Sequence, residues 1–196
     1  MEKPLSGRFR VLDSIRRGGP ISRVEIADAC GLSRSAVTGV VQALQNEGWI
    51  AELPESGNNG TNGTNGDSHR GRPRVNLDMN PAAAHVLGVK LSLHRMSVAV
   101  TDFRGDVLHT TTLPFNGSQH PDIAADMIEV GVRRCLIEAK IDKSRVLGLC
   151  VAIPGYINNL EGMCYWSPIF DRDDVAFGPL LAERFPFPTS IENDAN

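Results

Sequence analysis

Apolar residues recur at helical spacing between Ile21 and Leu44, in the segment ISRVEIADACGLSRSAVTGVVQAL. Its second half predicts a helix with one buried face, formed by Leu32, Val37, Val40, Val41 and Leu44. Ala27 is small enough to lie where two helices approach closely, and Gly31 suits a turn that needs a positive φ. Ser33 is a good N-cap for the second helix. The pattern therefore predicts two short helices joined by a tight turn.

The opposite face of the second predicted helix is polar. It carries Arg34, Ser35, Thr38 and Gln42, beside the N-cap residue Ser33. A helix-turn-helix places such a face in the major groove of DNA, where its side chains contact phosphates and base edges. A helical hairpin packed inside an ordinary core is the alternative, because short spacing patterns also recur by chance. We predict that these five residues contact DNA.

The segments on either side complete a winged-helix domain, which we place at residues 1–80. Upstream, a first helix is predicted, and it ends at the RRGG run 16–19. Its apolar residues are Phe9, Val11, Leu12 and Ile15. Downstream, residues 49–53 and 70–80 are predicted to be the two strands of the wing. Three helices and a hairpin make a complete small domain.

The segment between these two strands, residues 54–69, reads PESGNNGTNGTNGDSH and is low in complexity. Such a segment cannot bury apolar surface, so we predict a flexible wing tip. The tip either reaches the DNA or is a tolerated insertion without a role. Arg70, Arg72 and Arg74 follow it. Arginine is favoured in a narrow minor groove, so we predict that these three contact DNA, with a solvated basic strand edge as the alternative.

From residue 81 the pattern changes to that of an α/β lobe. Three β-rich runs with short turns predict an antiparallel meander, at residues 86–93, 96–103 and 106–115. Pro121 opens a predicted helix, whose buried face would be formed by Ile123, Met127, Ile128, Val132, Cys135, Leu136 and Ala139. The continuous apolar run 146–157 predicts a strand with both faces covered. A helix at 176–185 and a strand from Thr189 to Glu192 follow.

This order of elements predicts an α+β chain of two domains. The first is the winged helix-turn-helix, and the second, at residues 81–196, is one α/β lobe. Three antiparallel strands, a helix, a strand, a helix and a strand are typical of the actin-like and sugar-kinase folds, which are ribonuclease H-like.

Charge differs between the two halves of the chain. The 196 residues carry a net charge of −3, but residues 1–75 carry +2 and residues 76–196 carry −5. A mildly basic N-terminal part followed by an acidic C-terminal part is typical of a nucleic-acid-binding domain joined to a separate sensor or assembly domain. Because the N-terminal part is only mildly basic, we expect its non-specific binding to nucleic acid to be weak and salt-sensitive.

Hydropathy and cysteine usage favour a cytoplasmic protein. No apolar run is long enough to span a membrane, and the N-terminus lacks the apolar core of a signal peptide. The cysteines fall on apolar stretches and form no CxxC pair. This pattern favours reduced thiols over a metal site. The four cysteines are Cys30, Cys135, Cys150 and Cys164.

The order of several short motifs resembles the ROK family of repressors and sugar kinases. These motifs are the arginine-rich strand GRPRVNLDMNP, the run LGVKLSL followed by VAVTDFRGDVL, the run GLCVAIPGYIN with Ile153-Pro154-Gly155, and IENDAN at 191–196. Their order and spacing match the family almost from end to end. The winged helix places the chain with the regulators of the family rather than its kinases.

The resemblance also indicates that the chain is not an enzyme. Kinases of the family have an Asp-x-Gly-x-Thr loop after the first strand, in which the acid positions a metal and the glycines let the backbone approach a phosphate. The same place here reads Lys90-Leu91-Ser92-Leu93-His94. A lysine instead of the acid, and bulky residues instead of glycine, cannot hold ATP and magnesium.

Asn193 and Asp194 match positions that bind sugar hydroxyls in the family. An amide and a carboxylate side by side suit bidentate recognition of hydroxyls, although a capped turn at a strand end is the alternative. Residues 168–174, PIFDRDD, depart from the asparagine-bearing loop that the family usually has there. The usual sugar pose is therefore not expected here, and the site holds either another ligand or none.

Family members continue with a second lobe, so the resemblance implies a chain truncated after the first. The second lobe would carry a cysteine-rich zinc motif and much of the dimer surface. We therefore expect no cofactor in this chain, and a homodimer for the full-length form.

The function expected from the sequence is a sequence-specific transcriptional regulator. We expect a repressor of carbohydrate-use genes that binds a double-stranded DNA operator, responds to a sugar or sugar phosphate, and does not contact a membrane. One alternative is a sugar kinase with an appended DNA-binding domain. Another is an interaction fragment that acts on a full-length paralogue.

Overall fold

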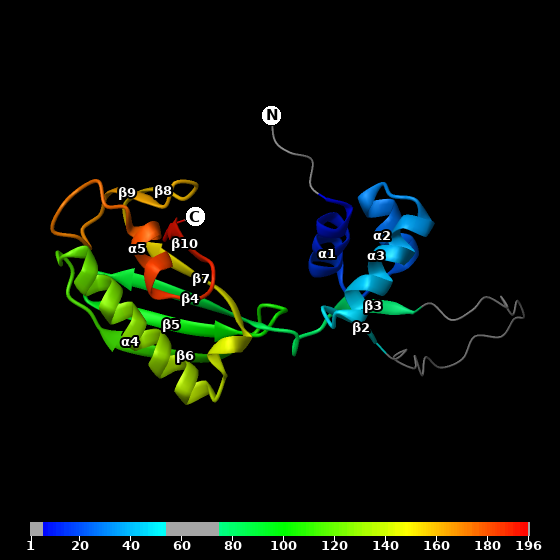
Figure 1. Ribbon diagram of the computed structural model, residues 1–196, viewed down its shortest axis with the longest axis horizontal. Coiled ribbons are helices and arrows are strands. Elements are labelled where there is room, and N and C mark those ends of the chain that lie inside the picture. The colour runs from blue at the N-terminus through cyan, green and yellow to red at the C-terminus, as the bar shows by residue number, and fades with distance from the viewer. Residues whose placement is uncertain (1–5, 54–74, 196) are drawn as a thin grey trace, which may run out of the picture. The chain divides into compact units, whose positions relative to one another are not determined.

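The computed structural model describes residues 6–53 and 75–195, which fall into two compact units (Figure 1). We call Met1–Ala83 the N-terminal unit and Ala84–Asn196 the C-terminal unit. Each has its own buried apolar core.

The N-terminal unit contains three helices and a small antiparallel sheet. Its elements are α1 (Gly7–Gly18), β1 (Ile21–Ser22), α2 (Arg23–Cys30), α3 (Arg34–Asn46), β2 (Ile50–Leu53) and β3 (Asn76–Met79). The strand order is β1-β3-β2, with all pairs antiparallel. The core consists mainly of fully buried aliphatic side chains, among them Val11, Ile15, Ile26, Val37, Val41, Leu44 and Leu77. The expected winged helix is present.

The start of the helix-turn-helix differs from the sequence expectation. Ile21 and Ser22 pair with Leu77 and Asn76 of β3, so they form a short strand, and the helix begins at Arg23. Ser22 then caps α2 in a capping box. Its side chain accepts from the Glu25 backbone N–H, and the Glu25 carboxylate accepts from the Ser22 N–H at 2.9 Å. Serine at this position ends the strand and starts the helix.

The C-terminal unit is a five-stranded mixed sheet with two helices and a small hairpin. Its elements are β4 (His85–Ser92), β5 (Arg95–Thr101), β6 (Val107–Pro114), α4 (Pro121–Ala139), a 3₁₀ turn η1 (Lys143–Arg145), β7 (Val146–Ile153), β8 (Tyr156–Asn158), β9 (Met163–Trp166), α5 (Phe177–Arg184) and β10 (Thr189–Asn193). The sheet order is β10-β7-β4-β5-β6. The expected meander β4–β5–β6 is antiparallel, while β7 and β10 run parallel to β4.

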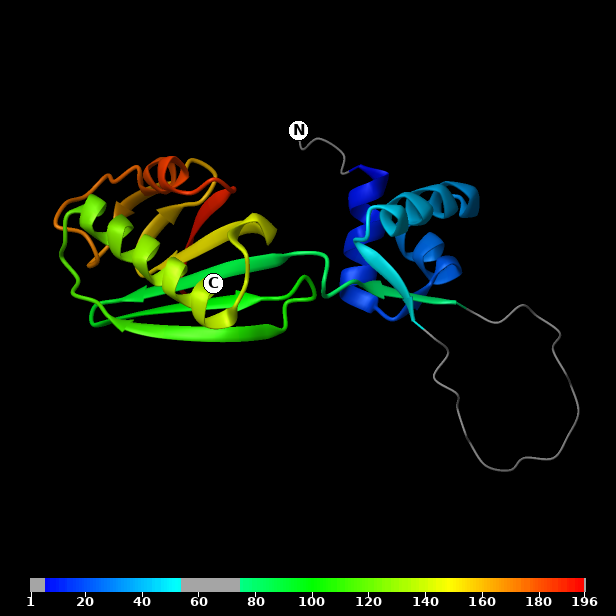
Figure 2. The same cartoon turned by 60° about the horizontal axis from the view of Figure 1, so that its bottom comes forward.

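Both helices of this unit cover the same face of the sheet (Figure 2). Alternate strand residues such as Leu87, Val98 and Val151 are fully buried beneath them. On the other face of the sheet, the row Cys150–Gly88–Ala99 lies across β7, β4 and β5 and is only partly buried. The expectation that β7 is covered on both faces is therefore wrong for the described residues. We call this second side the open face.

The apolar run 146–157 does not form one strand. β7 ends at Ile153, and β8 then pairs antiparallel with β9. Gly155 has φ +141°, and a Cβ there would lie 2.1 Å from the Trp166 carbonyl oxygen. Proline followed by glycine in this conformation ends the strand and redirects the chain into the hairpin.

The buried face of α4 also differs from the expected one at its start. Ile123 is exposed, whereas Ala124 and Ala125 are fully buried. Further along, a Cβ at Gly131 would come within 2.6 Å of the Met96 side chain on β5. The helix therefore packs closely on the sheet through small residues, and its larger residue Ile123 points outward.

Candidate nucleic-acid interface

The turn between α2 and α3 has the geometry expected of a helix-turn-helix. Gly31 adopts a left-handed conformation with φ 61°, and its N–H donates to the Ala27 carbonyl, which ends α2. Two residues later, the Ser33 side chain accepts from the Ala36 N–H at 3.2 Å, which starts α3. Both predictions, glycine in the turn and serine as N-cap, are confirmed.

One side of α3 is buried and the other is exposed. Val37, Val41 and Leu44 are fully buried in the N-terminal unit. Five residues of this region are predicted to contact DNA, and all five are exposed. They are Ser33, Arg34, Ser35, Thr38 and Gln42. A helix with one such buried side presents its opposite side to solvent along its whole length.

Hydrogen bonds within α3 orient several of these polar side chains. The Thr38 hydroxyl donates to the Arg34 carbonyl at 2.8 Å, and the Gln42 amide donates to the Asn46 side chain at 3.0 Å. The hydroxyls of Ser33 and Ser35 lie 3.1 Å apart. The face is thus partly ordered before any ligand is bound.

Sequence reasoning missed three further residues on this face, Ala36, Gly39 and Asn46. All three are exposed, and a Cβ at Gly39 would meet no atom within 4 Å. Gly39 and Asn46 lie four residues after Ser35 and Gln42, respectively, so helical spacing could have identified them.

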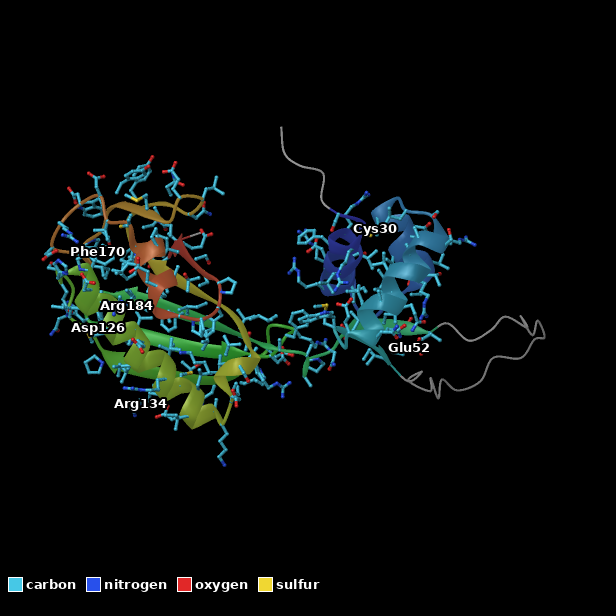
Figure 3. The ribbon with its side chains drawn as sticks, in the orientation of Figure 1. Cys30, Glu52, Asp126, Arg134, Phe170 and Arg184 are labelled. Carbon is cyan, nitrogen blue, oxygen red and sulfur yellow. The ribbon has the colours of Figure 1, made fainter. Side chains whose placement is uncertain are left out.

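Polar contacts hold α3 against the rest of the N-terminal unit. The Arg23 guanidinium donates to the Gln45 amide oxygen and to the Glu52 carboxylate, and Gln45 also donates to Glu52. Glu52 is labelled in Figure 3. Together these hydrogen bonds connect the start of α2, the end of α3 and the strand β2. The exposed face of α3 is therefore fixed relative to the first strand of the wing.

A second contact connects α1 to the end of α3. The Arg8 guanidinium donates two hydrogen bonds to the Glu47 carboxylate, and the Trp49 indole N–H donates to it at 2.9 Å. The bond from Arg8 is the main reason that the pKa of Glu47 falls to about 2. Glu47 therefore remains ionised at all physiological pH values.

The wing tip at 54–69 and the three arginines Arg70, Arg72 and Arg74 lie outside the described residues. Their predicted contacts with DNA therefore remain predictions. The strands on either side, β2 and β3, are paired as expected, with Leu53 opposite Asn76.

The second predicted site lies at the carboxyl ends of β7 and β10, where ligands bind in open α/β sheets. The Asn193 amide donates to the Gly155 carbonyl and accepts from the Ala195 N–H, so it stabilises the turn after β10. Asp194 forms an ion pair with Lys90, whose ammonium nitrogen lies 3.3 Å from its carboxylate. Lys90 thus faces the carboxylate that the sequence predicts to bind a sugar.

The described residues contain no group of three or more His, Cys, Asp or Glu side chains that could hold a metal ion. Three of the cysteines are buried and Cys150 is half-buried. Burial raises the pKa of Cys164 to about 11 and also raises that of Cys135. Across residues 6–53 and 75–195, no helix has the length and apolar character needed to cross a membrane.

Known proteins resemble this chain along nearly its whole length. A model described as the MarR family matches residues 4–58. The xylose repressor of Bacillus spizizenii is 24% identical over 95% of this chain, and the DNA-binding transcriptional repressor Mlc of Escherichia coli is 23% identical over 95%. ROK family transcriptional regulators are homologues of this chain.

A solved structure supports the same relationship at the level of the fold. A ROK family transcriptional regulator, described as a homologue of E. coli Mlc, covers 95% of this chain with a TM-score of 0.72 and 23% identity. The expected fold class, a winged helix-turn-helix followed by an α/β lobe, is confirmed. The chain spans 45% of the xylose repressor and 43% of Mlc.

Proposed function

We propose that this chain is a sequence-specific DNA-binding repressor of carbohydrate-use genes. The observation that carries the proposal is the exposed polar face of α3, which begins at a capped N-terminus and is held to β2 by the hydrogen bond from Gln45 to Glu52. The names of the ROK relatives, xylose repressor and DNA-binding transcriptional repressor, support it.

In this proposal α3 enters the major groove. Arg34 and Gln42 then reach base edges, because arginine pairs well with guanine and glutamine with adenine. Ser33, Ser35 and Thr38 contact phosphates or bases from the same face. Arg70, Arg72 and Arg74 enter the minor groove beside it. In a homodimer, two such helices read half-sites one or more helical turns apart.

Selection of DNA from a random pool, followed by sequencing, tests this proposal. We expect an enriched sequence, and a palindromic one if the protein binds as a dimer. Arg34→Ala should cost about 1–3 kcal/mol of binding to that sequence, whereas Arg16→Ala on α1 is the matched control and should cost little. Failure to enrich any sequence, or equal effects of the two substitutions, would exclude this role for α3.

We also propose that the C-terminal unit does not transfer phosphate. The residues at the place of the family's phosphate loop do not fit a magnesium-bound nucleotide, because Lys90 is a cation there and is already paired with Asp194. In the structure, Leu93 and His94 form the two-residue turn between β4 and β5. Isothermal titration with ATP and Mg²⁺ should show no binding, and measurable binding would favour the alternative of a sugar kinase.

A sugar effector is the third part of the proposal. Asp194 would accept bonds from sugar hydroxyls at the end of β10, with Asn193 holding the turn in place. The sugar hydroxyls would compete with Lys90 for that carboxylate. Titration of monosaccharides into the wild type and Asp194→Asn should therefore show binding that the substitution removes, and equal affinities would rule out Asp194 as a ligand.

A further inference from the structure

An exposed apolar stripe runs along the outer side of α4. Ile123, Val130 and Ile137 are 51%, 49% and 70% exposed, although the inner side of the same helix is almost completely buried. The three residues are spaced by seven, so they drift only about 20° per step around the helix and share one line. We call them the α4 stripe.

Charges beside the stripe are divided between the two halves of the helix. The N-terminal half carries the acids Asp122, Asp126 and Glu129, whereas the C-terminal half carries Arg133, Arg134 and Glu138, and Lys140 caps its end. All seven are exposed, and Glu138 pairs with Arg134. One end of the outer side is therefore acidic, and the other end has an excess of basic groups.

Three of the acids and one of the bases already have a partner within the chain. Arg184 of α5 contacts Asp122 and Asp126, and Arg134 contacts Glu138. Figure 3 labels Arg184 and Asp126. Both aspartates nevertheless keep more than half of their side chains exposed. Arg133 is exposed beside the stripe, on the same side as Asp126.

Val130 lies midway between Ile123 and Ile137, and this gives the stripe a symmetric register. If a second α4 runs antiparallel with a two-fold axis at Val130, Ile123 of one copy lies level with Ile137 of the other. The same register brings Asp126 to within one residue of the level of Arg133 in the other copy. It likewise brings Asp122 to within two residues of the level of Lys140.

We propose that two copies of this chain associate through antiparallel pairing of their α4 helices. The outer side of α4 complements its own reverse in both apolar and charged positions, as an isologous two-fold interface requires. A parallel pair would instead place acid against acid and base against base, which is unfavourable. The opposite charges at the two ends therefore set the direction of pairing.

A groove beside Ile137 offers additional apolar contact. It has a volume of about 220 Å³ and is lined in part by Leu136, Ile141 and Phe185. In the antiparallel register, Ile123 of the second copy lies next to this groove. A single helix pair is smaller than the roughly 1,200 Å² of a standard interface, so the dimer should be weak and should depend on protein concentration.

Sedimentation of the full chain over a range of concentrations tests whether the dimer exists. Val130→Glu places two carboxylates at the two-fold axis and should weaken association at least ten-fold. Val107→Glu alters a valine on β6 that is 63% exposed, against 49% for Val130, and is the matched control. Circular dichroism of both variants confirms that they are folded. A chain that stays monomeric, or that associates equally with and without Val130→Glu, would overturn the proposal.

Cysteine cross-linking tests the direction of pairing. Val130→Cys should form a disulfide dimer with itself, because the two sulfurs meet at the axis. Ile137→Cys should not, because the two positions lie about 21 Å apart along the helices and a disulfide needs Cα atoms within about 7 Å. A mixture of Ile123→Cys and Ile137→Cys should cross-link, with the wild type as background. Efficient self-linking of Ile137→Cys, or none for Val130→Cys, would overturn the antiparallel arrangement.

Discussion

Gly39 lies in the middle of the exposed face of α3 and contributes no side chain to it. Glycine inside a helix is less stable than alanine by roughly 0.5–1 kcal/mol, and a Cβ at this position would meet no neighbouring atom. A glycine in such a place lets another molecule approach the helix backbone closely. Its presence is easier to explain by contact with DNA than by the stability of the fold.

Gly39→Ala should therefore change the stability of the fold and the affinity for DNA in opposite directions. We expect the free energy of unfolding to rise by about 0.5–1 kcal/mol, while affinity for the selected DNA falls because the methyl group lies between the helix and the groove. Urea denaturation and fluorescence anisotropy measure the two effects. Gly18→Ala at the end of α1 is the control, since its Cβ would meet only ordinary contacts. Unchanged DNA affinity for Gly39→Ala would show that this part of α3 does not approach DNA.

At the scale of single residues, the sequence predicted which side chains of α3 are exposed, because helical periodicity separates the two sides of a helix. It did not predict Gly39, because glycine has no polar side chain that would mark it as a contact to DNA. Nor did it predict the contact between Lys90 and Asp194, which are far apart in the chain and become neighbours only through the pairing of β4, β7 and β10.

Among the secondary-structure elements, the stability of α2 depends on its N-cap residue, Ser22. Ser22→Ala removes the side chain that caps α2 and should lower the free energy of unfolding by about 1 kcal/mol. Thermal denaturation of the wild type and the variant measures this loss. Ser190→Ala is a suitable comparison, because Ser190 is an exposed serine on β10. A cost no greater than that of Ser190→Ala would show that α2 does not need its cap.

The contact between α4 and β6 should make stability depend on pH. Glu138 of α4 accepts hydrogen bonds from Thr111, Arg134 and His109, with Thr111 contributing most, and these bonds lower its pKa to about 2. A lowered pKa in the folded state stabilises the protein above the ordinary value of 4.5. This contribution is lost as the pH falls toward 2.

Glu138→Gln should therefore destabilise the chain at pH 7 and have progressively less effect below pH 4.5. The measurement is the difference in urea midpoint between wild type and variant across this range. Glu129→Gln on the same helix provides the control for loss of one charge. If the difference stayed constant down to pH 2, the carboxylate of Glu138 would not be the source of the stability.

Most elements of the fold were predictable from periodicity and from turn residues, including the meander, α4 and the strand β10. The exceptions have physical reasons. β1 has two residues, too few to show alternation, and the hairpin β8–β9 follows from the conformation of Gly155. Periodicity predicts that Ile123 is buried, because apolar residues usually face the core, whereas the small residues of α4 allow closer packing at that end of the helix.

For the whole molecule, the charge balance bears directly on DNA binding. The first 75 residues carry a net charge of only +2, so a few arginines account for much of the attraction to phosphates. Arg72→Ala with Arg74→Ala should weaken binding and should reduce the slope of log affinity against log salt by about 2.

Arg104→Ala with Arg145→Ala removes the same charge from the C-terminal unit and is the matched control. Its slope should equal that of the wild type. An unchanged slope after the Arg72 and Arg74 substitutions would show that these residues do not contact the DNA backbone.

The open face of the sheet has a consequence for chemical reactivity. Cys150 lies on it and is the one cysteine of the four that is not fully buried, whereas the raised pKa values of Cys135 and Cys164 keep those thiols protonated and slow to react. A maleimide or iodoacetamide reagent should therefore label the native protein at Cys150 without any engineering. The rate of that alkylation reports directly on whether this side of the sheet is accessible in solution.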